Sequence, residues 1–373
     1  MKELLVSIFC FLLLSCGGSG NDSVETERIS DSPAVPVNDI TPEAEQFVDS
    51  LMATLTLEER VGQCLMPSIY TSSDSATLRL FRRYIDDFHV GGVVLMQGSL
   101  ESAKQLSGIS EISPVPLFMA IDAEWGLGMR LSDAPVFPKN GNFPEGTDEL
   151  VMFDYGTEIA EECHKAGINM VLGPVVDIVG SGSNVIGKRS FGSNPDMVAN
   201  FGVAYSRGLE SGGVVSVAKH FPGHGSAVND SHRGVARVDK NVSAIDSIDL
   251  RPFREYINSG LSGIMAGHIQ ADALDPEGKA ASVSMAMLTS LLRKEMGFQG
   301  LILTDAFDMG GAKGFSAAEA IEAGADIILC PNDLEREYHD VLVKVRQGDL
   351  DMKTLDDRCR RILFIKYLFG LFK

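Results

Sequence analysis

The sequence is poor in several features that mark whole classes of proteins. Its 373 residues include six cysteines, and no two of these are spaced as C-x-x-C, which argues against a structural zinc site. Lysine and arginine total 32 against 51 aspartates and glutamates, so the formal net charge is −19. Because phosphate binding requires clustered basic residues, we expect no nucleic-acid partner. No G-x-G-x-x-G motif follows the first apolar run that could form a strand, which argues against a dinucleotide-binding sheet.

The N-terminal apolar run, residues 4–14, is too short to cross a bilayer as a stable helix. It follows Lys2 and ends at Ser15-Cys16 in a pattern that resembles a bacterial lipoprotein signal. We therefore expect residues 1–15 to be a signal peptide, and Cys16 to carry a lipid that anchors the exported protein to a membrane, in the periplasm or at the cell surface. An ordinary secretory signal, with Cys16 present by chance, is the alternative. Glycines, prolines and acids over residues 16–40 indicate a flexible tether.

The remaining cysteines are Cys64, Cys163, Cys330 and Cys359. Cys64 and Cys330 lie in apolar runs of strand length, so we expect four separate buried thiols. A disulfide between two of them is the alternative for an exported protein.

Apolar runs of strand length alternate with amphipathic stretches of helix length from Thr41 to the C-terminus. Thr41 and Pro42 suit a helix N-cap and the first helical position, which predicts a helical lead-in. Alternation of strand and helix implies parallel pairing with right-handed crossovers. We therefore predict an α/β fold over residues 41–373: a single (β/α)8 TIM-type barrel that ends in a C-terminal helix, with a doubly wound open sheet as the competing architecture. The expected strands are 63–70, 91–96, 116–121, 168–176, 214–221, 262–269, 300–306 and 325–330.

Polar side chains recur where these apolar runs end, and barrel enzymes build their active sites at the carboxyl ends of the strands. An acid such as Asp305 is costly in an apolar run unless it faces a functional pocket, although it could instead cap the next helix. Arg189, in a loop of small residues, could reach a ligand hydroxyl or be a surface cation. The residues at the strand ends are Asp122, Glu124, Asp177, Lys219, His220, His268 and Asp305.

The stretch 214–232 combines a buried strand with a polar loop. Proline and two glycines after His220 prevent both helix and strand from continuing. Asp230 and His232 follow in this loop, two residues apart, so the carboxylate could hold the imidazole in one tautomer and raise its basicity. A solvated loop histidine is the simpler alternative. A metal site is not expected, because no H-x-H follows the first strand and the histidine spacings do not match a chelating set; we expect no cofactor.

The string KHFPGHG at Lys219–Gly225, followed by Asp230-Ser231-His232, resembles the signature of glycoside hydrolase family 3, and specifically its β-N-acetylhexosaminidase branch. The resemblance runs from about residue 45 to 372, and its matching strings occur in order. Besides that signature they are Asp122-Ala-Glu-Trp-Gly, Gly173-Pro-Val-Val-Asp177, Lys188-Arg-Ser-Phe-Gly, Met265-Ala-Gly-His-Ile and Leu303-Thr-Asp-Ala-Phe-Asp-Met.

This resemblance implies a retaining glycosidase with Asp305 as nucleophile and the pair Asp230 and His232 as the general acid/base. It also implies that Asp122, Arg189, Lys219 and His220 hold the sugar hydroxyls, with His268 nearby. Two strings depart from the family pattern. Arg233-Gly-Val-Ala stands where Leu-Pro is usual, and Trp125-Gly-Leu-Gly-Met-Arg130 stands where hexosaminidases often carry Gly-Gly-Arg, which is expected to alter the pocket rim.

The resemblance thus predicts an enzyme that releases non-reducing terminal β-linked N-acetylglucosamine from oligosaccharides, most naturally peptidoglycan-derived fragments. Together with the N-terminal signal it gives a lipid-anchored enzyme, which we expect to be monomeric. Another family 3 glycosidase of the β-glucosidase type, or an N-acetylglucosaminide phosphorylase, is the alternative within enzymes. A lipoprotein that binds glycans without turnover is the alternative of another class.

Overall fold

The structure is a computed structural model that describes residues 37–38, 40–180, 185–227 and 234–372. The expected signal peptide, Cys16 and nearly all of the expected tether lie outside the described residues, as do Asp230 and His232. Within the described residues, no helix is long and apolar enough to cross a membrane.

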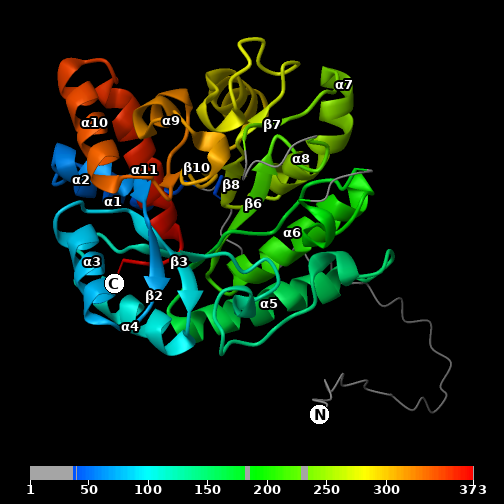
Figure 1. Ribbon diagram of the computed structural model, residues 1–373, viewed down its shortest axis with the longest axis horizontal. Coiled ribbons are helices and arrows are strands. Elements are labelled where there is room, and N and C mark those ends of the chain that lie inside the picture. Colours follow the sequence, from blue (N-terminus) through cyan, green and yellow to red (C-terminus); the bar gives the residue numbers. More distant parts are fainter. Residues whose placement is uncertain (1–36, 39, 181–184, 228–233, 373) are drawn as a thin grey trace. The chain divides into compact units, whose positions relative to one another are not determined.

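Eleven strands, all paired in parallel, alternate with helices in the described residues (Figure 1). Seven of them form one sheet in the order β10-β8-β6-β5-β4-β3-β2. The strands are β1 Leu65–Met66, β2 Ser68–Thr71, β3 Gly92–Gly98, β4 Phe118–Ile121, β5 Met170–Val171, β6 Val215–Phe221, β7 Ala236–Arg237, β8 Gly263–Ala266, β9 Ile269–Gln270, β10 Leu301–Thr304 and β11 Ile328–Leu329.

The sheet curls, because strands near its two ends come together. The expected strand 63–70 is divided at Pro67, whose ring nitrogen has no hydrogen to donate. Before Pro67, β1 pairs with β11; after it, β2 pairs with β3. Leu303 in β10 forms a bridge with Ile327, next to β11. The α/β class with a curled parallel sheet is confirmed, whereas closure into one complete barrel stays a prediction.

Helices connect the strands and cover the sheet (Figure 1). Thr41 caps α1 and a Thr56–Glu59 capping box starts α2, so two short helices precede the first strand. The α-helices are α1 Pro42–Met52, α2 Leu57–Gln63, α3 Ser75–Asp86, α4 Leu100–Ser110, α5 Glu149–Ala166, α6 Pro195–Ser211, α7 Val242–Ala244, α8 Arg251–Asn258, α9 Ala317–Ala323, α10 Leu334–Gln347 and α11 Met352–Leu368, with π-helical turns at Ile245–Asp249 and Ala286–Glu295.

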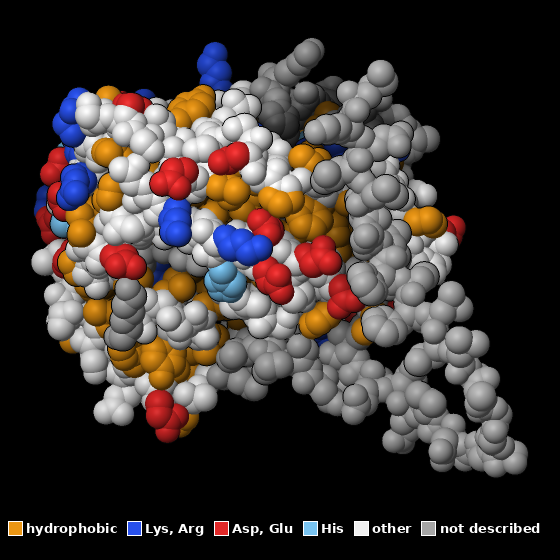
Figure 2. Space-filling view, turned by 90° about the horizontal axis from the view of Figure 1, so that it is seen from below, with side chains coloured by type: hydrophobic (Ala, Val, Ile, Leu, Met, Phe, Trp, Pro, Cys, Tyr) orange, Lys and Arg blue, Asp and Glu red, His pale blue; other side chains and the backbone are white. Residues whose placement is uncertain are grey.

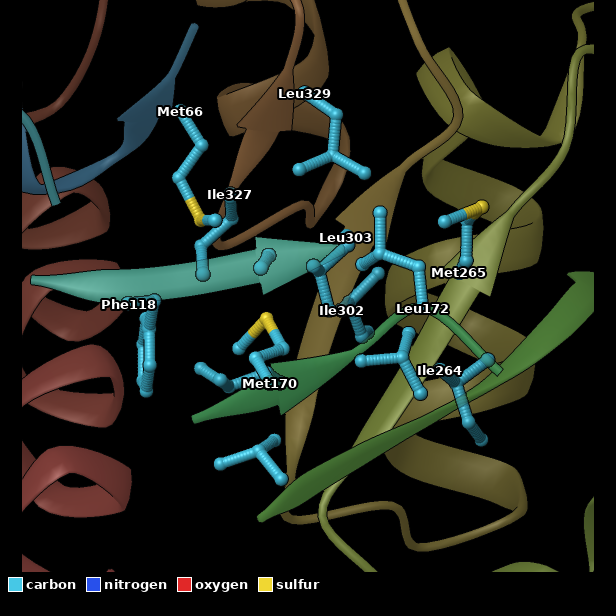
Figure 3. Packing of buried hydrophobic residues seen from close by; sticks show 14 of the residues in the cluster. Met66, Phe118, Met170, Leu172, Ile264, Met265, Ile302, Leu303, Ile327 and Leu329 are labelled. Carbon is cyan, nitrogen blue, oxygen red and sulfur yellow. The ribbon is translucent and has the colours of Figure 1, made fainter. Parts of the chain in front are cut away.

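The core lies among the strands. Every residue of β4, β6, β8 and β10 is buried, as expected for parallel strands covered on both sides. Figure 3 shows side chains from several strands packing together, among them Phe118, Met170, Ile264 and Leu303. The four cysteines outside the N-terminal segment are free and buried, as their apolar surroundings predict. On the face drawn in Figure 2, acidic and basic side chains are interspersed with hydrophobic ones.

Candidate active site

A cavity of about 390 Å³ lies at the carboxyl ends of the parallel strands. One part of its wall is ionic, and another is apolar and includes four methionines. The lining residues are Val94, Met96, Asp122, Glu124, Met129, Arg130, Leu172, Val185, Arg189, Lys219, His220, His224, Met265, Asp305, Ala306, Asp308, Met309, Leu329 and Cys330.

Lys219, near the carboxyl end of β6, is the centre of a network of mostly buried ion pairs. Its Nζ lies 2.7 Å from Asp122 Oδ1 and 2.8 Å from Glu124 Oε1, and its side chain is only 3% exposed. Arg130 pairs with the other oxygen of Asp122. Arg189 donates to both oxygens of Glu124, at 3.0 Å from Nε and 2.7 Å from Nη2. Three cations thus bind two carboxylates, and each hydrogen bond between them is charge-assisted.

These contacts favour the charged forms of Asp122, Glu124 and Lys219. Burial raises the pKa of the Asp122 and Glu124 carboxyl groups, but Lys219 and an arginine at each outweigh it, so both pKa values lie below the usual range. Burial alone would lower the pKa of Lys219, and the two carboxylates reverse the shift and raise that pKa. The wall therefore offers fixed donors and acceptors to a polar ligand.

The structure brings together three of the residues expected to bind sugar, Asp122, Arg189 and Lys219. Sequence reasoning assigned no role to Glu124 and Arg130. The short Asp-x-Glu spacing of two acids at the end of an apolar run is a signal for shared cations, which could have identified Glu124. Arg130 reaches Asp122 because its loop returns to β3: the Gly98 N–H donates to the Arg130 carbonyl at 3.2 Å. Nothing in the local sequence indicates that return.

His220 is oriented by Asp177, which follows β5 and is buried. His220 Nδ1 lies 2.7 Å from Asp177 Oδ2. The backbone N–H groups of His220 and His224 donate to Asp177 Oδ1 at 3.2 and 2.6 Å. These bonds hold the pKa of Asp177 below its usual value despite burial, so the carboxylate accepts and Nδ1 carries the proton. The expected sugar-binding role of His220 is compatible with this, since His220 also lines the cavity.

Asp305 follows β10 directly and lines the cavity while only 8% exposed. Its Oδ1 accepts the Ala306 N–H at 2.9 Å. Burial raises its pKa, but His220, then His268, outweigh burial and hold that pKa below its usual value. Asp305 does not cap α9, because Ser316 is the N-cap of that helix. An ionised carboxylate at a cavity is the state that a nucleophile needs.

His268 lies behind the cavity wall, fully buried. Its Nε2 donates to the Ala306 carbonyl at 3.0 Å, and its Nδ1 lies 2.8 Å from the Ser282 hydroxyl oxygen. Both ring nitrogens are therefore occupied by the protein. This geometry supports a role in holding the backbone next to Asp305, while direct sugar binding by His268 stays a prediction.

The remaining expected catalytic residues, Asp230 and His232, lie outside the described residues, between Ala227 and Gly234. Within the described ranges, no group of three or more histidine, cysteine, aspartate or glutamate side chains is arranged to hold a metal ion. What the described cavity offers is an ionised carboxylate beside fixed ionic groups that can recognise a polyhydroxylated ligand, in a volume typical of small-molecule sites.

Comparison with known proteins identifies the family. The profile described as "Glycosyl hydrolase family 3 N terminal domain" matches residues 56–365. A β-hexosaminidase from Nitrosomonas eutropha is 36% identical over 260 residues, which cover 65% of this chain and 74% of that protein. A β-hexosaminidase from Neisseria meningitidis is 32% identical over 293 residues, covering 72% of this chain and 80% of that protein. β-Hexosaminidase A from Pseudoalteromonas piscicida is 36% identical, but the chain spans only 46% of its length.

Solved structures agree. A glycoside hydrolase family 3 β-N-acetylglucosaminidase from Paenibacillus superposes with a TM-score of 0.80 at 30% identity, covering 85% of this chain and 63% of that one. The structure named LpqI from M. tuberculosis superposes with a TM-score of 0.74 at 28% identity, covering 84% and 95%. The resemblance read from the sequence is therefore confirmed, and the chain belongs to glycosyl hydrolase family 3.

Proposed function

We propose that this chain is a retaining β-N-acetylhexosaminidase that releases non-reducing terminal β-linked N-acetylglucosamine from oligosaccharides such as peptidoglycan fragments. The observation that carries the proposal is Asp305, a carboxylate kept ionised in a mostly buried site beside the ion pairs of Lys219. The names of the relatives, β-hexosaminidase and β-N-acetylglucosaminidase, support the substrate class.

In the first step, an Asp305 oxygen attacks the anomeric carbon and forms a glycosyl ester, while the bond to the leaving oxygen breaks. His232, oriented by Asp230, gives its proton to that oxygen. In the second step, His232 takes a proton from water, and the hydroxide attacks the anomeric carbon and frees the Asp305 carboxylate. An imidazole suits both steps near neutral pH, because its ordinary pKa is about 6.5.

The ion-pair network around Lys219 binds the substrate. Lys219 pairs with Asp122, and Glu124 pairs with both Lys219 and Arg189, so the orientations of these side chains are fixed and little side-chain entropy is lost on binding sugar hydroxyls. His220, held through Nδ1 by Asp177, is oriented at the cavity for contact with a sugar hydroxyl. His268 acts through the Ala306 backbone, which also donates to Asp305.

The proposal includes closure of the curled sheet into a single (β/α)8 barrel within residues 41–373. Support comes from parallel pairing of β1 with β11 and from the bridge between Leu303 and Ile327. Closure would direct all strand ends toward one mouth. The proposal also includes export and a lipid anchor on Cys16, which rest on the N-terminal sequence alone.

Trapping the covalent intermediate tests the function. Purified protein is incubated briefly with a 2-acetamido sugar that carries a 5-fluoro group and a good leaving group, and its intact mass is measured. We expect a gain of one sugar that maps by peptide digestion to Asp305. The matched control is Asp305→Asn, which keeps the size of the side chain and should give no adduct.

Neither adduct nor release of the leaving group would overturn the enzymatic function and leave glycan binding. Release without an adduct would overturn the covalent step alone. An adduct on another carboxylate would overturn the assignment of Asp305. Running the unfluorinated substrate with and without phosphate separates hydrolysis from phosphorolysis.

A further inference from the structure

Asp249, a buried carboxylate that the mechanism above does not use, lies against the base of the segment that carries Asp230 and His232. It ends the π-helical turn Ile245–Asp249 and is 1% exposed. Its Oδ1 accepts from the Ser226 hydroxyl at 3.0 Å, and its Oδ2 lies 2.7 Å from Lys240 Nζ. Ser226 precedes residues 228–233 and Lys240 follows them, so one carboxylate contacts both flanks.

Each flank is also held independently by a segment that follows a strand of the large sheet, β5 on one side and β8 on the other. On the first side, the His224 N–H donates to Asp177, and the Gly180 N–H donates to the Gly225 carbonyl at 3.2 Å. On the second side, β7 pairs with β9, and the Ala236 N–H donates to the His268 carbonyl at 3.0 Å. The two flanks are thus anchored to different parts of the protein, and Asp249 links them.

The turn before Ser226 is built around Asp249. Gly223 has φ of 128°, and a Cβ on it would lie 2.7 Å from Asp249 Cβ. No L-residue is comfortable with that φ, and the contact leaves no space for a side chain. Position 223, where the backbone passes close to Asp249, therefore requires glycine.

A contribution to folding stability does not by itself explain why a carboxylate is buried at position 249. Burial raises the pKa of Asp249 even though Lys240 and Ser226 act to lower it, so the ionised form is only partly compensated. Buried ion pairs are often no more stabilising than apolar residues of similar size, and their best-attested use is to fix one arrangement.

We propose that Asp249, with Ser226 and Lys240, forms a clamp that sets the spacing of the two flanks and that the general acid/base steps of the reaction depend on this spacing. Asp249 is thus a positioning residue, and the proposal rests on the proposed function. Breaking the clamp should impair proton transfer to the leaving group and from water, while attack by Asp305 should be kept.

Leaving-group dependence provides the test. A 2,4-dinitrophenyl β-N-acetylglucosaminide needs little protonation of its leaving group, whereas an alkyl β-N-acetylglucosaminide depends on it. For Asp249→Asn we expect kcat/KM to fall about 10–100-fold on the alkyl substrate and less than about threefold on the dinitrophenyl substrate, since general acid catalysis typically contributes 10²- to 10⁴-fold.

Azide provides a second readout. Azide attacks the anomeric carbon of the glycosyl ester without needing a base, frees the Asp305 carboxylate and forms a glycosyl azide. Turnover of the dinitrophenyl substrate by Asp249→Asn should therefore rise with added azide, with glycosyl azide as product. Lys240→Met should give the same pattern, and Ser226→Ala a weaker one.

The control is Asp275→Asn. Asp275 is also a buried carboxylate with a serine partner, Ser284 at 2.6 Å, but both of its hydrogen bonds, to Ser284 and to the Glu277 N–H, lie in its own loop. If Asp275→Asn lowers kcat/KM at all, it should do so by the same factor on the alkyl and the dinitrophenyl substrate. Melting temperatures of all variants show whether they fold; if Asp249→Asn does not, Lys240→Met and Ser226→Ala carry the test.

The clamp would be overturned if Asp249→Asn lowered kcat/KM equally on both substrates, did not lower it at all, or did not respond to azide. In each of these cases an active wild-type protein leaves the proposed function standing. A wild-type protein that releases neither leaving group would overturn the proposed function, and the clamp with it.

Discussion

Buried ionisable side chains lie at both ends of the parallel strands, and the two ends keep them in different states. At the carboxyl ends, Asp122, Glu124 and Lys219 have two or more charged partners each. Their pKa values shift toward the charged form. At the amino ends, Glu210 and Lys366 have neutral partners, and burial moves the pKa of each to about 7.

Glu210 lies in the last turn of α6, and its carboxyl group contacts residues at the starts of β6 and β8. It accepts from the Ser216 hydroxyl at 2.6 Å and from the Ser262 N–H at 3.0 Å. Burial raises its pKa more than these hydrogen bonds lower it. Neutral donors therefore do not replace the solvation that the carboxylate loses.

Lys366 in α11 is the cationic counterpart. Its Nζ donates to Gln63 Oε1 at 2.7 Å and lies 5.1 Å from the centre of the Phe118 ring. Burial lowers its pKa to about 7, and two neighbouring thiols offset only part of the effect.

Asp326 shows that the number of charged partners, rather than the end of the sheet, decides the state. It lies just before β11, fully buried, and Arg293 and Arg361 contact its two oxygens at 2.8 and 2.6 Å. Burial raises its pKa, but the two arginines prevail and its pKa is lowered. A fold can thus keep a buried charge wherever several opposite charges converge, and at the cavity it does so next to the expected nucleophile.

Lys219→Met should have the largest effect on this comparison. It removes the cation shared by Asp122 and Glu124, and breaking a buried pair from one side costs about 3–5 kcal/mol. We expect the free energy of unfolding, measured with urea at pH 7, to fall by that amount and glycosidase activity to be lost. A fall below about 1 kcal/mol would mean that Arg130 and Arg189 alone sustain the two carboxylates.

Glu210→Gln should have the next largest effect, and it depends on pH. The folded state holds the Glu210 proton up to about pH 7, whereas the unfolded chain releases it near its ordinary pKa of about 4.3. Its contribution is thus fully present below pH 4.3 and is lost as pH rises through 7, by about 4 kcal/mol in total.

The glutamine variant removes this dependence. The difference in unfolding free energy between the variant and the wild type should grow in favour of the variant across that pH range, measured by urea unfolding at several pH values. A constant difference would show that Glu210 is ionised in the folded protein at neutral pH.

The sequence identifies the location of the site better than its internal contacts. Apolar runs that end in Asp122, Lys219 and Asp305 indicate the strand ends, because a polar residue there is costly without a pocket. The structure places all three at one cavity. These positions could be predicted since strand and polar end are adjacent in the chain.

Contacts between distant residues could not be predicted in this way. Asp177 is 43 residues from His220, and Asp249 is 23 from Ser226, so no local pattern pairs them. The division of the first strand at Pro67 depends on its pairing with both β11 and β3. Glu210 and Lys366 lie in amphipathic helices, where a charge usually faces solvent, so their burial gives no sequence signal.

Lys366→Met should have the smallest effect and the opposite sign to Lys219→Met. The unfolded chain binds the lysine proton up to about pH 10.4, whereas the folded protein releases it near pH 7. The buried ammonium therefore costs stability in full below pH 7, and the cost disappears as pH rises toward 10. Losing the hydrogen bond to Gln63 subtracts about 1 kcal/mol from the gain.

We expect the free energy of unfolding of Lys366→Met to exceed that of the wild type by about 1–2 kcal/mol at pH 7 and to lose this advantage by pH 10, since buried ionic groups can be replaced by apolar ones of similar size. Urea unfolding at the two pH values measures it, with Lys219→Met as the matched substitution. If both methionine variants lose several kcal/mol at pH 7, neutral partners stabilise a buried ammonium as well as carboxylates do, and the difference between the two ends of the strands disappears.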